Sequence, residues 1–326
     1  MTKARWLIPI LLLGLSMGCG DDGDDDGGGD PDSGTTDPGD ASSTEDAGSG
    51  GGDPLDGVGT AELLQGGFTF IEGPVWRVDD GVLLFSDIPE NTIHRLTPPS
   101  TVDVFLNPSG NSNGLTNYTD GRLVVAEHGT RRISIRAADN TVAEEWGMYE
   151  GDRLNSPNDI AVRSDGTLYF TDPPYGIQPG DQELAFNGVF RVDPAGQIVV
   201  EDERAVERRP NGIALSPDET VLYVADTADG AVVAYDVAAD GSLSGARQLT
   251  DATPNADGMA VDQDGNLFVT TAEGVKVFAP DGSLWGTITV PEQPANCAFG
   301  GEDGKTLFIT ARTGLYQVPV VIPGRL

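Results

Sequence analysis

Six short polar motifs, each followed by an apolar run, recur along this chain at intervals of 41, 45, 53, 46 and 39 residues. Their first residues are Glu72, Asn113, Asn158, Asn211, Asp257 and Asn296. These side chains offer two carboxylates and four amides, with no thiol or imidazole among them. Such a set of oxygen ligands suits a hard cation, and it suits Ca²⁺ better than Mg²⁺. The alternative is that Asn and Asp stand there as turn formers, an explanation that does not extend to Glu72.

The repeat of these motifs indicates one structural unit used six times. Residues 58–326 divide into six units of about 45 residues, a period typical of propeller blades. Within a unit, short apolar runs are joined by tight turns such as Asp165-Gly166, which is a hairpin signal. No long stretch has helical periodicity. The sequence therefore predicts an all-β, six-bladed β-propeller; a solenoid, the alternative repeat fold, fits the hairpin pattern less well.

The topology of a propeller blade predicts which residues share a face. The first strand of each blade is innermost and the second runs antiparallel to it, so the start of the first and the end of the second reach the same rim. The ends of the second strands carry His128 and Tyr175, the latter in a loop with two prolines. We expect both side chains on the face that carries the six polar residues.

The first 57 residues differ in composition from the rest. Lys3 and Arg5 precede a short apolar run that ends at Gly18-Cys19, which is typical of a secretory signal peptide. The cleavage site resembles a bacterial lipobox, which predicts a lipoprotein signal at residues 1–18 and a lipidated Cys19, although Ser16 stands where that pattern has leucine. The alternative is an ordinary signal peptide with an incidental cysteine.

Residues 19–57 are mostly Gly, Asp, Ser, Thr, Pro and Ala. Such a segment cannot bury enough apolar surface to fold, so we expect a disordered linker between the lipidated cysteine and the propeller. The predicted product is an exported bacterial membrane lipoprotein that faces the periplasm or the cell exterior. Gly20, rather than aspartate, after the cysteine favours the outer membrane.

Acidic residues outnumber basic ones by 52 to 19, which gives a formal net charge of −33. This charge repels phosphates, so it disfavours nucleic acid as a partner. Cys19 and Cys297 are the only cysteines. With Cys19 lipidated, no disulfide holds the fold, and Cys297 is expected to be a small core residue. Nothing in the sequence indicates an oligomeric state.

Seven motifs, in order along residues 58–326, resemble the gluconolactonase branch of the senescence-marker-protein (regucalcin) superfamily. They are Ile71–Trp76, Asn113–Thr116, Val125–Arg132, Ser156–Asp159, Phe170–Gly176, Pro210–Ala214 and Asp257–Met259. The resemblance implies a six-bladed propeller with one divalent cation in its central channel, often calcium, with Mg²⁺, Mn²⁺ and Zn²⁺ as the other candidates. It also implies hydrolysis of sugar lactones such as gluconolactone, so a small-molecule lactone is the expected substrate.

The resemblance also implies roles for individual residues. It places the metal ligands on Glu72, Asn158, Asn211 and Asp257, and it makes Asp257 the usual candidate for general base. Coordination to a metal lowers the basicity of a carboxylate, so His128 is the competing base or a contact to the substrate. The expected substrate contacts are Asn113, Asn158, Asn296 and Tyr175.

Two other functions are compatible with the same residues. A similar cation site could polarise the P=O bond of an organophosphate, because the ligands alone do not separate a carbonyl from a phosphoryl electrophile. A non-catalytic binding propeller with a structural metal is the other. The motifs outside the ligand set favour the lactonase over the first, and the presence of all four ligands favours it over the second.

Overall fold

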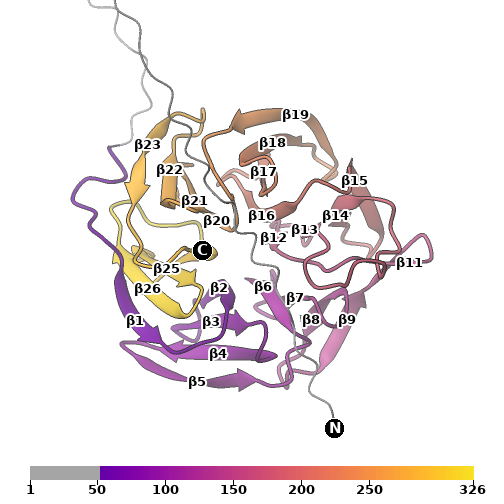
Figure 1. Ribbon diagram of the computed structural model, residues 1–326, viewed down its shortest axis with the longest axis horizontal. Helices are drawn as coiled ribbons and strands as arrows, with labels where there is room; N and C mark the ends of the chain where they lie inside the picture. The colour runs from indigo at the N-terminus through magenta and orange to yellow at the C-terminus, as the bar shows by residue number, and fades with distance from the viewer. Residues whose placement is uncertain (1–51) are drawn as a thin grey trace, which may run out of the picture. The chain divides into compact units, whose positions relative to one another are not determined.

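The computed structural model describes residues 52–326, and every regular element in this range is a β-strand. Six four-stranded antiparallel sheets surround a common centre, each with its first strand innermost (Figure 1). This confirms the predicted all-β, six-bladed propeller. The signal peptide at residues 1–18, the lipidation at Cys19 and most of the predicted linker lie outside the described residues.

The first three blades follow one another along the chain. Blade 1 consists of β2 (Ile71–Arg77), β3 (Val82–Asp87), β4 (Thr92–Thr97) and β5 (Thr101–Leu106). Blade 2 consists of β6 (Ser112–Asn117), β7 (Leu123–Glu127), β8 (Arg132–Arg136) and β9 (Val142–Trp146). Blade 3 consists of β12 (Ile160–Val162), β13 (Leu168–Asp172), β14 (Asn187–Val192) and β15 (Ile198–Arg204). The short hairpin of β10 (Met148–Tyr149) and β11 (Asp152–Arg153) links blades 2 and 3.

Blades 4 and 5 repeat the same order, but blade 6 is built from both ends of the described chain. Blade 4 is β16 (Pro210–Leu215), β17 (Val221–Asp226), β18 (Ala231–Val237) and β19 (Leu243–Thr250). Blade 5 is β20 (Met259–Val261), β21 (Leu267–Thr271), β22 (Gly274–Phe278) and β23 (Leu284–Ile288). Blade 6 is β24 (Asn296–Gly300), β25 (Thr306–Ala311), β26 (Gly314–Pro319) and, as its outer strand, β1 (Glu62–Gly66).

The apolar core lies mainly between successive blades. One cluster joins Ile133 of β8 to Phe170 of β13, and the ring is closed by Trp76 of blade 1, which stacks on Phe308 of blade 6 with ring centroids 5.6 Å apart. Cys297 is buried and free, as expected of a core residue. Packing of blade against blade, with no disulfide in the described residues, therefore holds the inner strands in place.

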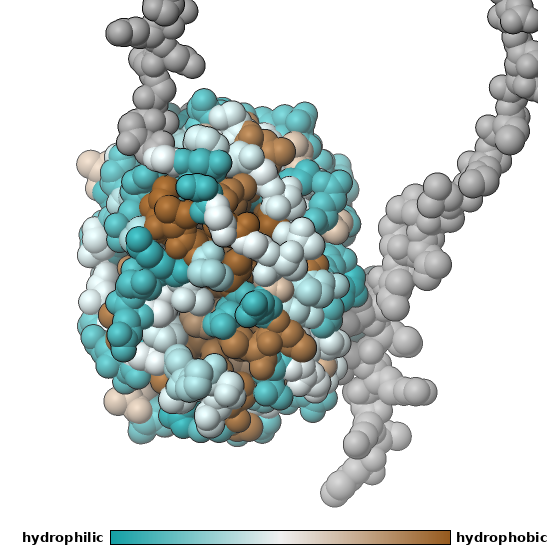
Figure 2. Space-filling view, turned by 90° about the vertical axis from the view of Figure 1, so that its left-hand side faces the viewer, coloured by the Kyte–Doolittle hydropathy of each residue, from teal (hydrophilic) through white to brown (hydrophobic). Residues whose placement is uncertain are grey.

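The segment that precedes β1 also packs on the propeller. Leu55 and Val58 contact the apolar cluster shared by blades 5 and 6, and the Ala61 N–H donates to the carbonyl of Thr289. Figure 2 shows the outer edge that includes β1 and β23, where apolar patches alternate with polar residues (Figure 2). Among the residues described, no helix is long and apolar enough to cross a membrane.

Candidate metal centre and active site

The six polar residues predicted from the repeat all stand at the same end of the six inner strands. The inner strands contact one another around the ring, so these residues surround the mouth of one channel. Five of them are buried, and Asp257 is half-buried. The six are Glu72, Asn113, Asn158, Asn211, Asp257 and Asn296.

Glycines explain how six backbones fit around so narrow a centre. The Gly114 N–H donates to the carbonyl of Asn158 (2.8 Å), and the Gly212 N–H donates to the carbonyl of Asp257 (2.9 Å). A Cβ on Gly212 would lie 2.3 Å from that same Asp257 oxygen, far inside van der Waals contact. Glycine therefore follows the polar residue in four blades because the next inner strand occupies the space of a side chain.

Blade 3 breaks this pattern, because Asp159 stands where Gly73, Gly114, Gly212 and Gly258 stand in their blades. Its carboxylate is buried and accepts hydrogen bonds from the N–H groups of Ile160 (3.0 Å) and Ile213 (3.3 Å). Asp159 is a third central carboxylate that was not among the predicted site residues. The signal for it was present in the sequence, as the one charged residue at a position otherwise held by glycine or Cys297.

These carboxylates perturb one another. Burial raises the pKa of Asp257 to about 7, with a further contribution from Asp159, while a hydrogen bond from Asn211 opposes the rise. Burial raises the pKa of Asp159 to about 6. The pKa of Glu72 is raised well above its ordinary value by burial and then by the charges of Asp257 and Asp159. No lysine or arginine contributes to any of these shifts.

The residues present therefore fit a divalent cation. A positive ion would relieve the repulsion among buried carboxylates that have no basic partner. The side-chain oxygen Oδ1 of Asn113 is also buried without a hydrogen-bond partner, so it is a further unused oxygen donor at the ring. Carboxylate and amide oxygens together form the donor set that Ca²⁺ prefers.

His128 lies against this ring, as the topology predicts. Its Nε2 is 3.2 Å from Nδ2 of Asn113. Burial lowers the pKa of His128 to about 4, so the imidazole is neutral near pH 7. The loop after β13 covers it so closely that a Cβ on Gly176 would lie 2.7 Å from the Cβ of His128. A neutral, enclosed imidazole is suited to hydrogen bonding, and it is a weak general base.

Tyr175 stands at the rim. Its side chain is 45% exposed, and its hydroxyl is within hydrogen-bonding reach of Thr227 and Asn211. Asn211 in turn donates through Nδ2 to the Thr227 hydroxyl (3.0 Å), which donates to the carbonyl of Ala256 (2.6 Å). This network places Tyr175 beside the predicted ligand Asn211, where it can contact a molecule that enters the channel.

Asn296 lies deeper, between two of the carboxylates. Its side chain is within hydrogen-bonding reach of both Glu72 and Asp159. Its Oδ1 also accepts the N–H of Cys297 at 2.8 Å. The amide that was predicted to contact substrate thus bridges the inner carboxylates in this structure.

The acidic residues at the ends of the second strands have structural contacts. Asp87 accepts the N–H groups of Thr69 (2.9 Å) and Phe70 (3.2 Å), which lead into β2. Glu127 is fully buried and binds Arg132 (2.8 Å) and Arg136 (2.5 Å). These carboxylates fix the loops around the rim rather than entering the ring.

The family model for the SMP-30/gluconolactonase/LRE-like region matches residues 70–313, which is most of the propeller. The chain belongs to this family. A gluconolactonase of Zymomonas mobilis is 38% identical over 288 residues, which cover 79% of this chain and 80% of that protein. A 6-deoxy-6-sulfogluconolactonase of Pseudomonas putida is 29% identical and covers 74% of this chain and 82% of its own length.

Solved structures agree with this membership. The structure of a gluconolactonase from Xanthomonas campestris has a TM-score of 0.76 and 34% identity, and covers 82% of this chain and 92% of its own. A calcium-binding regucalcin from Agrobacterium tumefaciens, at 21% identity and a TM-score of 0.69, shares the fold.

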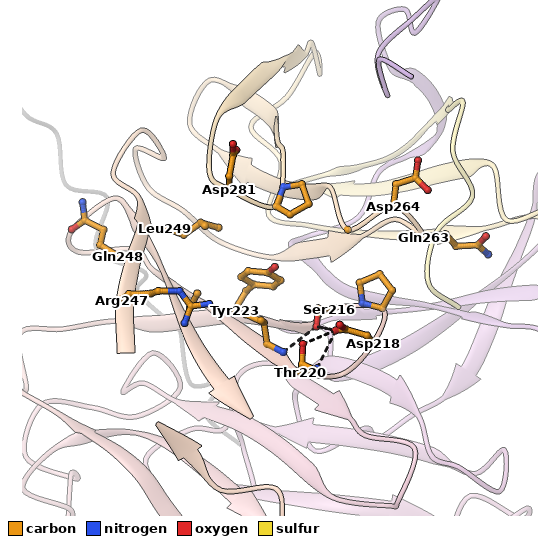
Figure 3. Close-up of a pocket in the computed structure, with 15 residues that line it drawn as sticks. Ser216, Asp218, Thr220, Tyr223, Arg247, Gln248, Leu249, Gln263, Asp264 and Asp281 are labelled. Carbon is orange, nitrogen blue, oxygen red and sulfur yellow. Dashed lines mark hydrogen bonds between the residues drawn. The ribbon is translucent and has the colours of Figure 1, made fainter. Parts of the chain in front are cut away.

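In this SMP-30/gluconolactonase family member two cavities extend away from the ring. One, of about 470 Å³, runs from Asp159 and Asn296 down the channel to the far ends of the inner strands. The other, of about 530 Å³, is a groove between blades 4 and 5 lined by turns at those far ends, including Asp218 and Asp264 (Figure 3). Neither is lined by Glu72 or Asp257.

Proposed function

We propose that this protein is a lactonase that hydrolyses sugar lactones such as gluconolactone and depends on a divalent cation, Ca²⁺ rather than Mg²⁺, Mn²⁺ or Zn²⁺. The observation that carries the proposal is the ring of buried oxygen donors at the channel mouth, with three carboxylates and no basic partner. Support comes from the relatives, because the Zymomonas protein and the Xanthomonas structure both carry the name gluconolactonase.

Glu72, Asn158, Asn211 and Asp257 would hold the cation. The chemistry that such an ion supplies when bound is Lewis-acid stabilisation of negative charge on a carbonyl oxygen. Tyr175 is exposed at the rim, whereas His128 is buried against Gly176, so we place the entry of the lactone on the side of Tyr175. Tyr175 and Asn113 would then orient the sugar hydroxyls.

Hydrolysis requires that a water oxygen attack the lactone carbonyl carbon while its proton is removed. The ring C–O bond then breaks, and the proton passes to the departing alkoxide, which leaves a hydroxy acid. Asp257 is the favoured proton acceptor, because His128 has a pKa near 4 and its Nε2 already faces the Asn113 amide. The hydrogen bond from Asn211 would hold the Asp257 carboxylate in position for this transfer.

The proposal includes export and attachment to a membrane through a lipid on Cys19. It rests on the sequence alone, with Lys3 and Arg5, the apolar run and Gly18-Cys19 as its support. A lipidated chain should be heavier than its cleaved polypeptide, and a Cys19→Ser variant should lose the difference. An unshifted mass for the wild-type protein would refute the anchor.

The test of the activity is hydrolysis of glucono-δ-lactone above its spontaneous rate, first in chelator and then after Ca²⁺ is restored. We expect chelation to abolish turnover, Ca²⁺ to restore it, and Asp257→Ala to remain inactive. Asp172→Asn is the matched control, because Asp172 is a buried carboxyl at the end of β13 that accepts the N–H of Asn155 (2.7 Å). A folded, cation-loaded protein that is inactive on lactones but cleaves an organophosphate, or that only binds sugars, would overturn the proposal.

A further inference from the structure

Arg209, at the rim, lacks an acidic partner in a protein rich in acids. Among residues 52–326, four basic side chains have no carboxylate oxygen within 4.0 Å, although acids outnumber bases by 52 to 19 in the whole chain. They are Arg153, Arg209, Lys305 and Arg312. Arg209 is the one of these that stands next to a predicted ligand, two residues before Asn211.

The backbone of Arg209 is fixed to the site. Its N–H donates to Oδ1 of Asp226 (3.1 Å), and its carbonyl accepts the N–H of Thr227 (3.0 Å). Thr227 is the residue whose hydroxyl accepts the Asn211 amide. Arg209 therefore belongs to the same rigid corner of blade 4 as Asn211.

The side chain of Arg209 is half-buried and only partly used. Its Nη1 donates to the carbonyls of Val206 and Arg208, both in its own loop, and its Nε and Nη2 make no hydrogen bond within the described protein. Arg209 and Tyr175 both lie beside Thr227, because the Arg209 carbonyl accepts the Thr227 N–H and the Tyr175 hydroxyl is within hydrogen-bonding reach of the Thr227 side chain. The unused donors therefore belong to a residue near Tyr175 at the rim.

We propose that Arg209 binds an anionic group on the substrate, so that the preferred class is sugar lactones with a carboxylate or similar anion outside the lactone ring. This rests on the proposed lactonase function and goes beyond it. Guanidinium binds planar carboxylates through two parallel hydrogen bonds, which gives both affinity and orientation. Without such a cation, the charges of Glu72, Asp159 and Asp257 would disfavour an anionic lactone over a neutral one.

A purely structural role makes a different prediction. If Arg209 only supports the loop through Val206 and Arg208, its loss should affect neutral and anionic lactones equally. Arg208, its neighbour, forms an ion pair with Asp229 and so offers a matched control of the same residue type in the same loop.

The experiment compares two lactones that share one ring and differ only in a terminal group, glucaro-γ-lactone with a carboxylate and glucono-γ-lactone with a hydroxymethyl. It measures kcat/KM at saturating Ca²⁺ for the wild type, Arg209→Gln, Arg209→Lys and Arg208→Gln. We expect the wild type to prefer glucaro-γ-lactone. Arg209→Gln should lower kcat/KM for this lactone by roughly 10- to 100-fold, mainly through KM, the range for a lost hydrogen bond to a charged group.

The same variant should change kcat/KM for glucono-γ-lactone by less than about threefold, Arg209→Lys should recover part of the loss, and Arg208→Gln should alter neither substrate. Equal losses on both lactones, or no loss on either, would overturn the role of Arg209.

If the wild type hydrolyses neither lactone, the proposed function fails. Calorimetric binding of glucarate against gluconate then still tests Arg209, because only glucarate has the second carboxylate; equal binding of glucarate by wild type and Arg209→Gln would reject the site.

Discussion

Replacing Asp257 by asparagine should stabilise the cation-free protein and at the same time remove its activity. The reason is that the carboxylate is half-buried beside Asp159 and Glu72, with a pKa of about 7 in place of its ordinary 3.8. Such a difference corresponds to about 4 kcal/mol of destabilisation once the group is ionised in both states. Asparagine has the same shape without the charge, and it loses part of the Asn211 hydrogen bond, a cost of about 1 kcal/mol.

The sign of this effect depends on pH. Below about pH 4 the carboxyl is protonated in the folded and the unfolded chain, so its burial carries no ionisation cost. Between about pH 4 and pH 7 the unfolded chain releases the proton while the folded protein retains it, and stability falls as pH rises. Above about pH 7 the cost is complete. The gain from Asp257→Asn should therefore be near zero at pH 4 and reach about 1–3 kcal/mol at pH 8.

The assay is urea unfolding followed by tryptophan fluorescence, in chelator and in Ca²⁺, at both pH values. Ca²⁺ at 100 times its Kd should stabilise the wild type by about 2.7 kcal/mol and the variant much less. Asp172→Asn, which changes a buried carboxyl outside the ring, should leave the Ca²⁺ response intact. The reasoning is refuted if Asp257→Asn lowers stability in chelator at pH 8, or if Ca²⁺ stabilises the variant as much as the wild type.

Two further predictions concern the frame of the site. Gly212→Ala should destabilise the protein by roughly 1–3 kcal/mol and weaken Ca²⁺ binding, because the new Cβ would lie 2.3 Å from the Asp257 carbonyl oxygen. Thermal melting measures the stability and calorimetry the Ca²⁺ affinity. Gly59→Ala is the control that should change neither, because a Cβ on Gly59 meets no atom within 4 Å. Glu127→Gln should lower the free energy of unfolding by about 3–5 kcal/mol, because Arg136 and Arg132 would lose the buried partner that compensates their charge. Glu144→Gln, which removes an exposed ion pair with Arg122, should change the urea midpoint little. Similar losses of stability in the two variants would contradict this prediction.

The sequence was most informative where a local rule repeats. Hairpin turns and the spacing of six polar motifs predicted six blades and one shared rim, and the contacts of His128 with Asn113 and of Tyr175 with Asn211 agree with that rim. The family resemblance is likewise confirmed by the match over residues 70–313. The assignment of ligands, base and substrate contacts stays a prediction.

Long-range geometry was not predictable in the same way. Asp159 was missed although it is the one charged residue at its position in the repeat, because an aspartate after an asparagine also suits a turn, and its interaction with Glu72 and Asp257 follows only from the closed ring. The outer strand of blade 6 was missed for a similar reason. Nothing local in Glu62–Gly66 indicates pairing with Gly314–Pro319 at the other end of the chain.

The pairing of β1 with β26 also sets an order of events in time. β1 precedes every other strand in the described chain, yet its partner β26 follows all of them. Until the two strands pair, the backbone N–H and C=O groups of β1 lack their partners and the ring stays open. Bringing together strands so far apart in the chain costs conformational entropy, and only the contacts made at closure offset that cost. Folding to the finished ring must therefore wait until β26 is available to pair with β1, which makes closure of the ring a single late step.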